Sequence, residues 1–385
     1  MAFLPFYIPS QKRLRIVIIG GGYAGVAALT VLSQHASHVD ITFVDPKTQH
    51  LKITHLHETF RYPLSDLLIP FADLERQFGC RHVCAGPSVD EETLAQWQKD
   101  QFIVVNDENI AFDYLLIAAG CSDLAPKKID NVITLTDFMN EAGSDILNKV
   151  IANNSGEELG LTVVGGGATG IQFLFEIEAF LRRSKINKKL MLVDGGDHVL
   201  KQFPIEFSRY VETRMKELDI AFYPHTYFLE QKTDEVLLQD KNTKQSFSLP
   251  SQGSLYFTGK SKQSVFDANT NGQIIINGEP SHRLFTAGDC SNYSAFGSNT
   301  LTAQSAVRKG KLVARNMLRH SSVINILEPY LHRDLGYVVS LGSSDAVGWL
   351  ALEGNVVHGL PAQIIKEVVE AQYDLLLTGI DTYLV

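Results

Sequence analysis

The sequence predicts an α/β protein in which two similar units each contain a parallel β-sheet flanked by helices. Three observations carry this prediction. A β-branched run, a glycine-rich turn and a helix-like segment follow one another near residue 20, and the same succession recurs near residue 165. A third strand-like run, at 283–287, closes on Gly288 and Asp289. Strand, turn, helix and strand in this order are typical of a βαβ unit.

Composition agrees with a folded protein of roughly two to three domains. Hydrophobic residues make up 45% of the 385 residues and charged residues 20%. The net charge of -9 argues against nucleic acid as a partner, because phosphate binding needs a basic surface. Four cysteines are too few for a disulfide framework in a chain of this length, so we expect a reducing, cytoplasmic environment.

The first unit has every part of a dinucleotide cradle. The strand-like run at 14–19 leads into Gly-Gly-Gly-Tyr-Ala-Gly at 20–25, and a second run ends at Asp45. Gly20 permits the tight turn, Gly22 lets the backbone approach a pyrophosphate, and Gly25 lets the helix touch the strand. Asp45 can accept hydrogen bonds from a ribose, and the helix N-terminus favours phosphate. This order of elements predicts a Rossmann-like domain.

The second unit repeats the first about 145 residues later. A strand at 161–164 precedes Gly-Gly-Gly-Ala-Thr-Gly at 165–170, and a second strand ends at Asp194. Both units also contain an apolar strand that closes on glycine, at Gly120 and Gly259. We infer a duplication that binds two nucleotides, a resident flavin and a visiting nicotinamide nucleotide. Asp194 favours NADH, because a carboxylate repels the 2′-phosphate of NADPH.

With these motifs in order, the chain resembles the two-domain FAD/NAD(P) flavoproteins of the pyridine nucleotide-disulfide oxidoreductase superfamily, and within it type II NADH dehydrogenases, over about residues 13–350. The resemblance implies that Gly288 and Asp289 hold the flavin. It also implies that Gln304, in Ala-Gln-Ser-Ala-Val-Arg, lies at a quinone site, although Arg308 replaces that motif's second glutamine. Gln172 stands where many relatives have a glutamate near the nicotinamide, and Glu176 follows one helical turn later.

The expected site residues fall into three groups. The catalytic candidates are Gln172, Glu176 and Gln304. The residues expected to hold FAD are Gly20, Gly22, Tyr23, Ala24, Gly25, Asp45, Pro46, Val83, Ala119, Gly120, Gly288, Asp289 and Gln304. The residues expected to hold NADH are Gly165, Gly167, Ala168, Thr169, Gly170, Asp194 and Gly259. We predict no metal site, although His50, His55 and His57 form a local cluster.

The predicted activity is an FAD-dependent NADH dehydrogenase that passes electrons to a quinone-like acceptor. Three alternatives stay open: a reductase with a protein acceptor such as ferredoxin, a redox-state sensor or scaffold, and a sulfide:quinone reductase. The stretch 50–68 contains no cysteine, which argues against disulfide-reductase chemistry beside the flavin.

The predicted domains are a discontinuous FAD domain at 1–125 and 279–325, an inserted NAD(H) domain at 126–278, and a C-terminal segment at 326–385. The chain is expected to cross between domains at 126–128 and at 277–280. A helix at about 361–377 has an apolar side formed by Ile364, Ile365, Val368, Val369 and Tyr373. That side is expected to face the protein's own core, a second subunit in a homodimer, or the inner face of the membrane.

Overall fold

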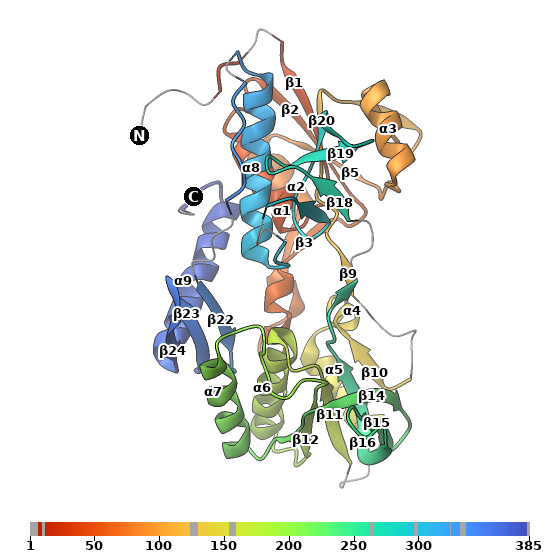
Figure 1. Ribbon diagram of the computed structural model, residues 1–385, viewed down its shortest axis with the longest axis vertical. Helices are drawn as coiled ribbons and strands as arrows, with labels where there is room; N and C mark the ends of the chain where they lie inside the picture. Colours follow the sequence, from red (N-terminus) through yellow and green to blue (C-terminus); the bar gives the residue numbers. More distant parts are fainter. Residues whose placement is uncertain are drawn as a thin grey trace.

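The computed structural model describes residues 7–9, 12–123, 130–153, 159–261, 265–295, 299–323, 325–331 and 336–382. It has two lobes, each built on its own sheet, with a small third sheet and the last helix along one side of both (Figure 1). The predicted α/β class with two Rossmann-like sheets is confirmed.

The first lobe contains an eight-stranded sheet in the order β21-β18-β19-β20-β8-β1-β2-β5. Strands β20, β8, β1, β2 and β5 are parallel neighbours, so their carboxyl ends share one edge. The strands are β1 (Leu14–Ile19), β2 (Val39–Asp45), β5 (Arg81–Cys84), β8 (Tyr114–Ile117), β18 (Phe266–Ala268), β19 (Gln273–Ile276), β20 (Glu279–Thr286) and β21 (Ser291–Tyr293). Around it lie α1 (Tyr23–Ser33), α2 (Phe71–Phe78), α3 (Glu91–Asp100), α8 (Ala303–Ser321) and the hairpin β6 (Phe102–Val105) and β7 (Glu108–Ala111).

The second lobe repeats this plan. Its sheet runs β13-β12-β11-β16-β15-β14, and β10 pairs with β16. The strands are β10 (Val132–Thr134), β11 (Gly160–Val164), β12 (Leu190–Val193), β13 (Ala221–Tyr223), β14 (Thr226–Gln231), β15 (Glu235–Asp240) and β16 (Ser246–Tyr256). The helices are α4 (Leu135–Phe138), α5 (Gly143–Asn153), α6 (Ala168–Arg183) and α7 (Ile205–Glu217).

The chain returns to the first lobe earlier than the sequence analysis placed the crossing. Strands β9 (Ser122–Asp123) and β17 (Lys260–Ser261) pair antiparallel between the lobes, and β18 and β19 already belong to the first sheet. Asn277 and Gly278, with φ of 52° and 85°, form the two-residue turn of the β19–β20 hairpin. We therefore propose a boundary near residue 265 in place of 279; the expected crossing at 126–128 lies outside the described residues.

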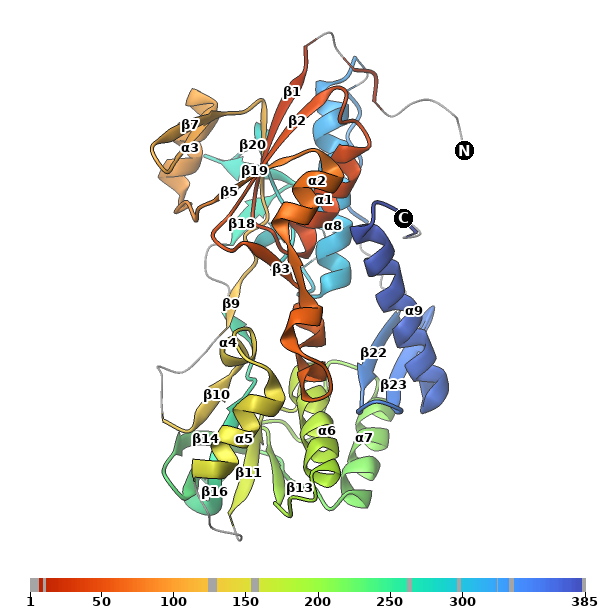
Figure 2. The same cartoon turned by 180° about the vertical axis from the view of Figure 1, so that it is seen from behind.

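A connecting segment bridges the lobes between α6 and the last helix (Figure 2). It consists of β3 (Gln49–Leu51), the 3-10 helices η1 (Ile53–Phe60) and η2 (Leu64–Leu67), and β4 (Leu68–Pro70). Phe60 and Leu67 pack in the core of the second lobe, whereas β3 and β4 pair with each other beside the first.

The C-terminal segment forms a three-stranded sheet followed by one helix. The elements are β22 (Gly336–Ser340), β23 (Ala346–Leu350), β24 (Leu352–His358) and α9 (Leu360–Leu377). Within the described residues no helix combines the length and apolar character needed to cross a bilayer.

The apolar side expected of this helix does not face the core as a whole. Tyr373 is buried, but Ile364 and Val368 are 55% and 58% exposed. The buried side instead includes Ala362, the aliphatic pair Leu376 and Leu377, and Lys366. Packing against the protein's own core therefore accounts for Tyr373 but leaves most of the expected apolar side uncovered.

Candidate functional site

The first glycine turn is shaped so tightly that only glycine fits at two of its positions. Gly20 has φ of +106°, and a Cβ there would lie 2.3 Å from the Ala118 carbonyl oxygen. A Cβ on Gly25 would lie 1.9 Å from the Gly20 carbonyl oxygen, because α1 begins directly against the turn. Gly22 differs, since a Cβ there would meet nothing within 4 Å. The turn is therefore closed toward the protein and open at Gly22.

The second glycine turn has the same geometry. Gly165 has φ of +112°, and its Cβ would lie 2.4 Å from the Phe257 carbonyl oxygen. A Cβ on Gly170 would lie 1.9 Å from the Gly165 carbonyl oxygen, whereas one on Gly167 would meet nothing within 4 Å. The two open positions are also the N-caps of α1 and α6, and neither cap carries a side-chain hydrogen bond. Each helix N-terminus can thus offer its first N–H groups to an anion.

An aspartate at the end of the second strand holds each turn. Asp45 Oδ2 accepts from the Gly21 N–H at 2.7 Å, and its Oδ1 accepts from the Lys47 N–H at 2.8 Å. Asp194 Oδ2 accepts from the Gly166 N–H at 2.6 Å, and its Oδ1 accepts from the Gly196 N–H at 2.6 Å. Both carboxylates are partly exposed, so their free lone pairs can still accept from a ribose.

The other residues expected at the first cradle come from neighbouring strands of the same sheet. Val83 lies in β5, Ala119 and Gly120 follow β8, and Gly288 and Asp289 follow β20. Because these strands are parallel, the residues meet at one edge, where open α/β sheets bind ligands. Gly120 and its counterpart Gly259 have φ of +73° and +95°, and a Cβ on either would meet open space.

Contacts around this edge fix its shape. Gly288, with φ of +78°, lies so close to α1 that its Cβ would be 3.0 Å from the Ala24 Cβ. The Cys121 thiol donates to Asp289 Oδ2 at 3.4 Å, and the Tyr23 hydroxyl lies 2.7 Å from Thr54 Oγ1. Pro46 is exposed beside Asp45, and Ala168 and Thr169 form the first turn of α6. Two open glycine positions, two helix N-termini and two partly exposed aspartates form an arrangement that fits two dinucleotides.

The three catalytic candidates lie in different surroundings. Gln172 is partly exposed on α6, and Gln304 is partly exposed in the first turn of α8, just after its N-cap Thr302. Glu176 is fully buried: Arg61 Nη2 lies 3.0 Å from its Oε1, and Arg61 Nε donates to Oε2 at 3.1 Å. Burial raises the pKa of the Glu176 carboxyl, although Arg61 opposes this. Because it has no exposed surface, Glu176 cannot touch a nucleotide in this conformation, and it anchors the end of η1 to α6.

Sequence reasoning missed a charged cluster between η1 and α9. Lys366 Nζ lies 2.7 Å from Glu58 Oε1 and 2.5 Å from Glu370 Oε1, and His55 Nδ1 lies 3.4 Å from Glu58 Oε2. Burial alone would raise the pKa of Glu58, but the His55 hydrogen bond and the Lys366 ammonium hold it below its usual range. His55, Glu58 and Glu370 have a spacing that suits a metal ion, but the Lys366 ammonium already supplies the positive charge there. The one sequence signal for this cluster was the position of Lys366 between two pairs of β-branched residues in a helix-like segment.

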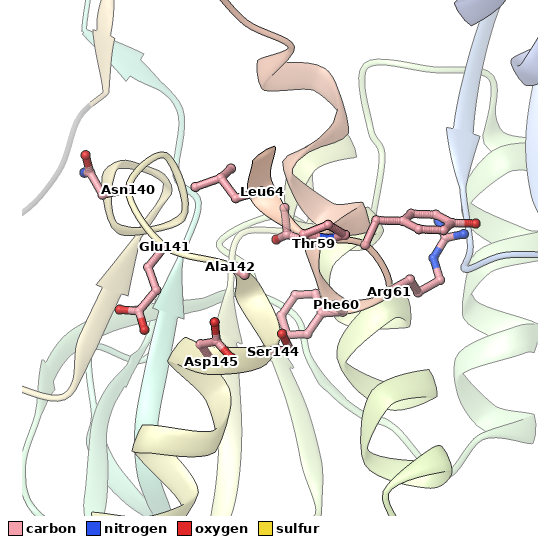
Figure 3. Close-up of a pocket in the computed structure, with 11 residues that line it drawn as sticks. Thr59, Phe60, Arg61, Leu64, Asn140, Glu141, Ala142, Ser144 and Asp145 are labelled. Carbon is pink, nitrogen blue, oxygen red and sulfur yellow. The ribbon is translucent and has the colours of Figure 1, made fainter. Parts of the chain in front are cut away.

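A cavity of about 530 Å³ lies beside this junction, between the segment 59–64 and the start of α5 (Figure 3). Phe60 and Thr59 face Ser144 and Asp145 across it. Its described lining contains none of the residues predicted to hold a nucleotide. We assign it no ligand.

Two glycine-turn cradles, each on the parallel part of a mixed sheet, define a protein with two dinucleotide-binding domains. Residues 14–310 match the pyridine nucleotide-disulphide oxidoreductase family, and the chain belongs to that family. The resemblance inferred from the motifs is thereby confirmed, as is an oxidoreductase class.

Individual relatives cover nearly the whole chain. The type II NADH:quinone oxidoreductase of Staphylococcus aureus is 25% identical over 408 aligned positions, covering 96% of this chain and 98% of the relative. The structure of NDH2 from Plasmodium falciparum in complex with NADH has a TM-score of 0.78 at 14% identity, covering 96% of both chains. The sulfide:quinone oxidoreductase of Aquifex aeolicus has a TM-score of 0.76 at 15% identity, covering 95% of this chain and 92% of the other. These two structures share the fold.

Proposed function

We propose that the protein is an FAD-dependent NADH dehydrogenase that passes electrons on to a quinone-like acceptor. The observation that carries this proposal is the pair of open cradles at Gly22 and Gly167, one in each lobe. The relative with NADH:quinone oxidoreductase activity supports it, because the chain matches that relative from end to end. FAD, when bound, supplies the hydride- and electron-transfer chemistry.

The chain's own residues bind and orient the nucleotides. We assign FAD to the first cradle, where Asp45, Gly120 and Asp289 surround the open turn. We assign NADH to the second cradle, where Asp194 would accept hydrogen bonds from the ribose. The Asp194 carboxylate disfavours a 2′-phosphate, and both its oxygens are fixed by backbone N–H groups, so it cannot turn away easily. Gln172, one turn into α6, can position the nicotinamide without a change of charge.

The acceptor is proposed to approach from the side of Gln304 and the C-terminal segment. Steady-state NADH oxidation with quinones of increasing hydrophobicity tests this assignment. A rate that rises with quinone hydrophobicity and depends little on salt supports a quinone. A rate that needs a small redox protein and falls with salt favours a protein acceptor instead. Slow turnover with every acceptor, accompanied by an NADH-dependent change in oligomeric state, favours a sensor.

Sulfide oxidation is disfavoured by the cysteines themselves. Cys290 is buried, and burial raises its thiol pKa, so it is a poor nucleophile. Burial likewise raises the pKa of Cys80 to about 11. Cys121 is partly exposed at the first cradle, where its thiol donates to Asp289 Oδ2, and Cys84 is exposed at the end of β5. Sulfide-dependent bleaching of the flavin would overturn this reading.

We propose that the outer face of α9 contacts a membrane surface, where quinones dissolve. Leu352, Leu360, Ile364, Val368 and Val369 are 43–66% exposed on this face and on the adjoining β24. The contact would be hydrophobic rather than ionic, because α9 carries more acidic than basic residues.

Co-sedimentation with zwitterionic vesicles tests this contact. Ile364→Glu should release the protein from the vesicles, whereas Ile205→Glu, at a similarly exposed position on α7, should not. If both variants bind equally and Ile364→Glu instead dissociates a dimer, the face is a subunit interface.

A further inference from the structure

The C-terminal helix α9 reaches the first glycine turn through two buried side chains. The Tyr373 hydroxyl lies 2.9 Å from His50 Nε2, and His50 Nδ1 lies 2.8 Å from the Gly21 carbonyl oxygen. Tyr373 and His50 are 5% and 1% exposed. The Tyr373 ring also packs on Tyr23, the first residue of α1, with ring centroids 4.5 Å apart.

The direction of these hydrogen bonds follows from the groups themselves. A carbonyl can only accept, so His50 Nδ1 carries the proton and donates to Gly21. Burial lowers the pKa of His50 to about 4, so the ring is neutral near pH 7 and its Nε2 accepts. The Tyr373 hydroxyl is therefore the donor, and the chain runs from Tyr373 through His50 to Gly21.

The Gly21 carbonyl matters because of the N–H on the other side of its peptide. In a planar trans peptide the two groups point in opposite directions. When His50 holds the Gly21 carbonyl, the Gly22 N–H points the opposite way, away from His50. A Cβ on the same residue would meet open space, so we infer that this N–H faces the open side of the turn. Asp45 holds the preceding peptide through the Gly21 N–H. The orientation of the phosphate-facing N–H thus depends on His50.

The second lobe holds the equivalent carbonyl in a different way. The Gly166 carbonyl accepts from the Leu200 N–H at 2.7 Å, a backbone bond within its own lobe. The duplicated turns therefore differ in the group that donates a hydrogen bond to this carbonyl. The NADH turn is held locally, whereas the turn assigned to FAD is held through side chains that end on α9.

We propose that Tyr373 and His50 are positioning residues for the FAD pyrophosphate, and that seating of α9 and retention of FAD are thermodynamically linked. The linkage is reciprocal: bound FAD stabilises the seated helix, and a displaced helix loosens FAD. The proposal rests on the assignment of FAD to the first cradle. It adds that α9, part of the C-terminal segment from whose side the electron acceptor is proposed to approach, also controls whether FAD stays bound.

Tyr373→Phe tests this, because it keeps the ring against Tyr23 and removes only the donor. Titration of apoprotein with FAD, followed by flavin fluorescence, should give a Kd about tenfold higher than that of the unaltered chain, the scale of one lost buried hydrogen bond. Tyr114→Phe is the matched control, since the Tyr114 hydroxyl lies 2.9 Å from His320 Nδ1, and this tyrosine–histidine pair joins β8 to α8 without involving α9. Its FAD Kd should stay within about twofold of the unaltered value.

Hydrogen exchange of the unaltered chain gives a readout that does not depend on the variant folding. FAD should slow amide exchange in 360–377, and Tyr373→Phe should reduce that protection. An unchanged FAD Kd in Tyr373→Phe, or equal exchange of α9 with and without FAD, would overturn the link while leaving FAD binding intact. If the unaltered chain binds no FAD at all, the assignment of the first cradle fails as well.

Discussion

Replacing Gly22 or Gly167 with alanine adds one methyl group to one cradle at a time, so the two variants test the two cradles separately. Gly22 has φ of -77° and Gly167 also has φ of -77°, with extended ψ, so alanine fits both backbones. A Cβ at either position meets no protein atom within 4 Å. Gly→Ala at a compatible site stabilises a fold by about 0.4–1 kcal/mol, because it restricts the unfolded chain. Neither variant should therefore lower the free energy of unfolding of the apoprotein.

Each variant should weaken the binding of a different nucleotide. The added methyl occupies the space through which a pyrophosphate reaches the turn, so Gly22→Ala should weaken FAD binding by about a hundredfold or more. Gly22→Ala should be purified colourless, whereas Gly167→Ala should stay yellow but lose reduction by NADH. The assay is the absorbance of bound flavin before and after NADH addition, with thermal unfolding of the apoprotein measured in parallel.

Gly25→Ala provides the structural contrast. Its Cβ would lie 1.9 Å from the Gly20 carbonyl oxygen, where ordinary contacts begin at 3.4 Å. Helix α1 would have to move by about 1.5 Å, at a cost of about 3 kcal/mol or more. This variant should lose stability whether or not FAD is present. If Gly22→Ala keeps flavin with unchanged affinity, the assignment of the first cradle is refuted.

Three further outcomes follow from named contacts. Asp194→Ser should lower the kcat/KM preference for NADH over NADPH by about tenfold, because the repelling carboxylate is gone. Lys366→Met should cost about 3 kcal/mol in urea unfolding, because it removes the ammonium that lies between the half-buried Glu58 and Glu370 carboxylates, whereas Lys149→Met, at an exposed pair, should cost under about 0.5 kcal/mol. Burial lowers the pKa of His50 to about 4 and of His57 to about 3, so below pH 6.5 the unfolded chain binds protons that the folded chain does not. The free energy of unfolding measured in urea should therefore be steady above about pH 6.5 and fall below it, by about 1.4 kcal/mol per pH unit for each histidine; a flat profile would contradict this.

The local part of the site could be predicted from the sequence because its signals are local. A β-branched run, glycines at fixed spacing and an acid at the next strand end depend on backbone geometry alone, and the structure has both turns where the sequence expects them. The crossing at 277–280 was misplaced because Asn-Gly marks a hairpin turn as strongly as it marks a boundary.

The non-local part could not be predicted. The Tyr373–His50 contact joins residues 323 positions apart, and no periodicity indicates which buried donor meets which acceptor. Glu176 looked like a surface or catalytic acid, because sequence does not show that Arg61 closes over it. Helix spacing grouped Tyr373 with Ile364 and Val368, although only Tyr373 is buried. It could not tell that Lys366, paired with Glu58, would take the buried side.

An anaerobic titration of the purified protein with NADH tests the two cradles together. The account predicts that the yellow absorbance of bound flavin disappears in proportion to added NADH, complete at one NADH per flavin. Flavin that stays oxidised under excess NADH, or protein that holds no flavin, would contradict it.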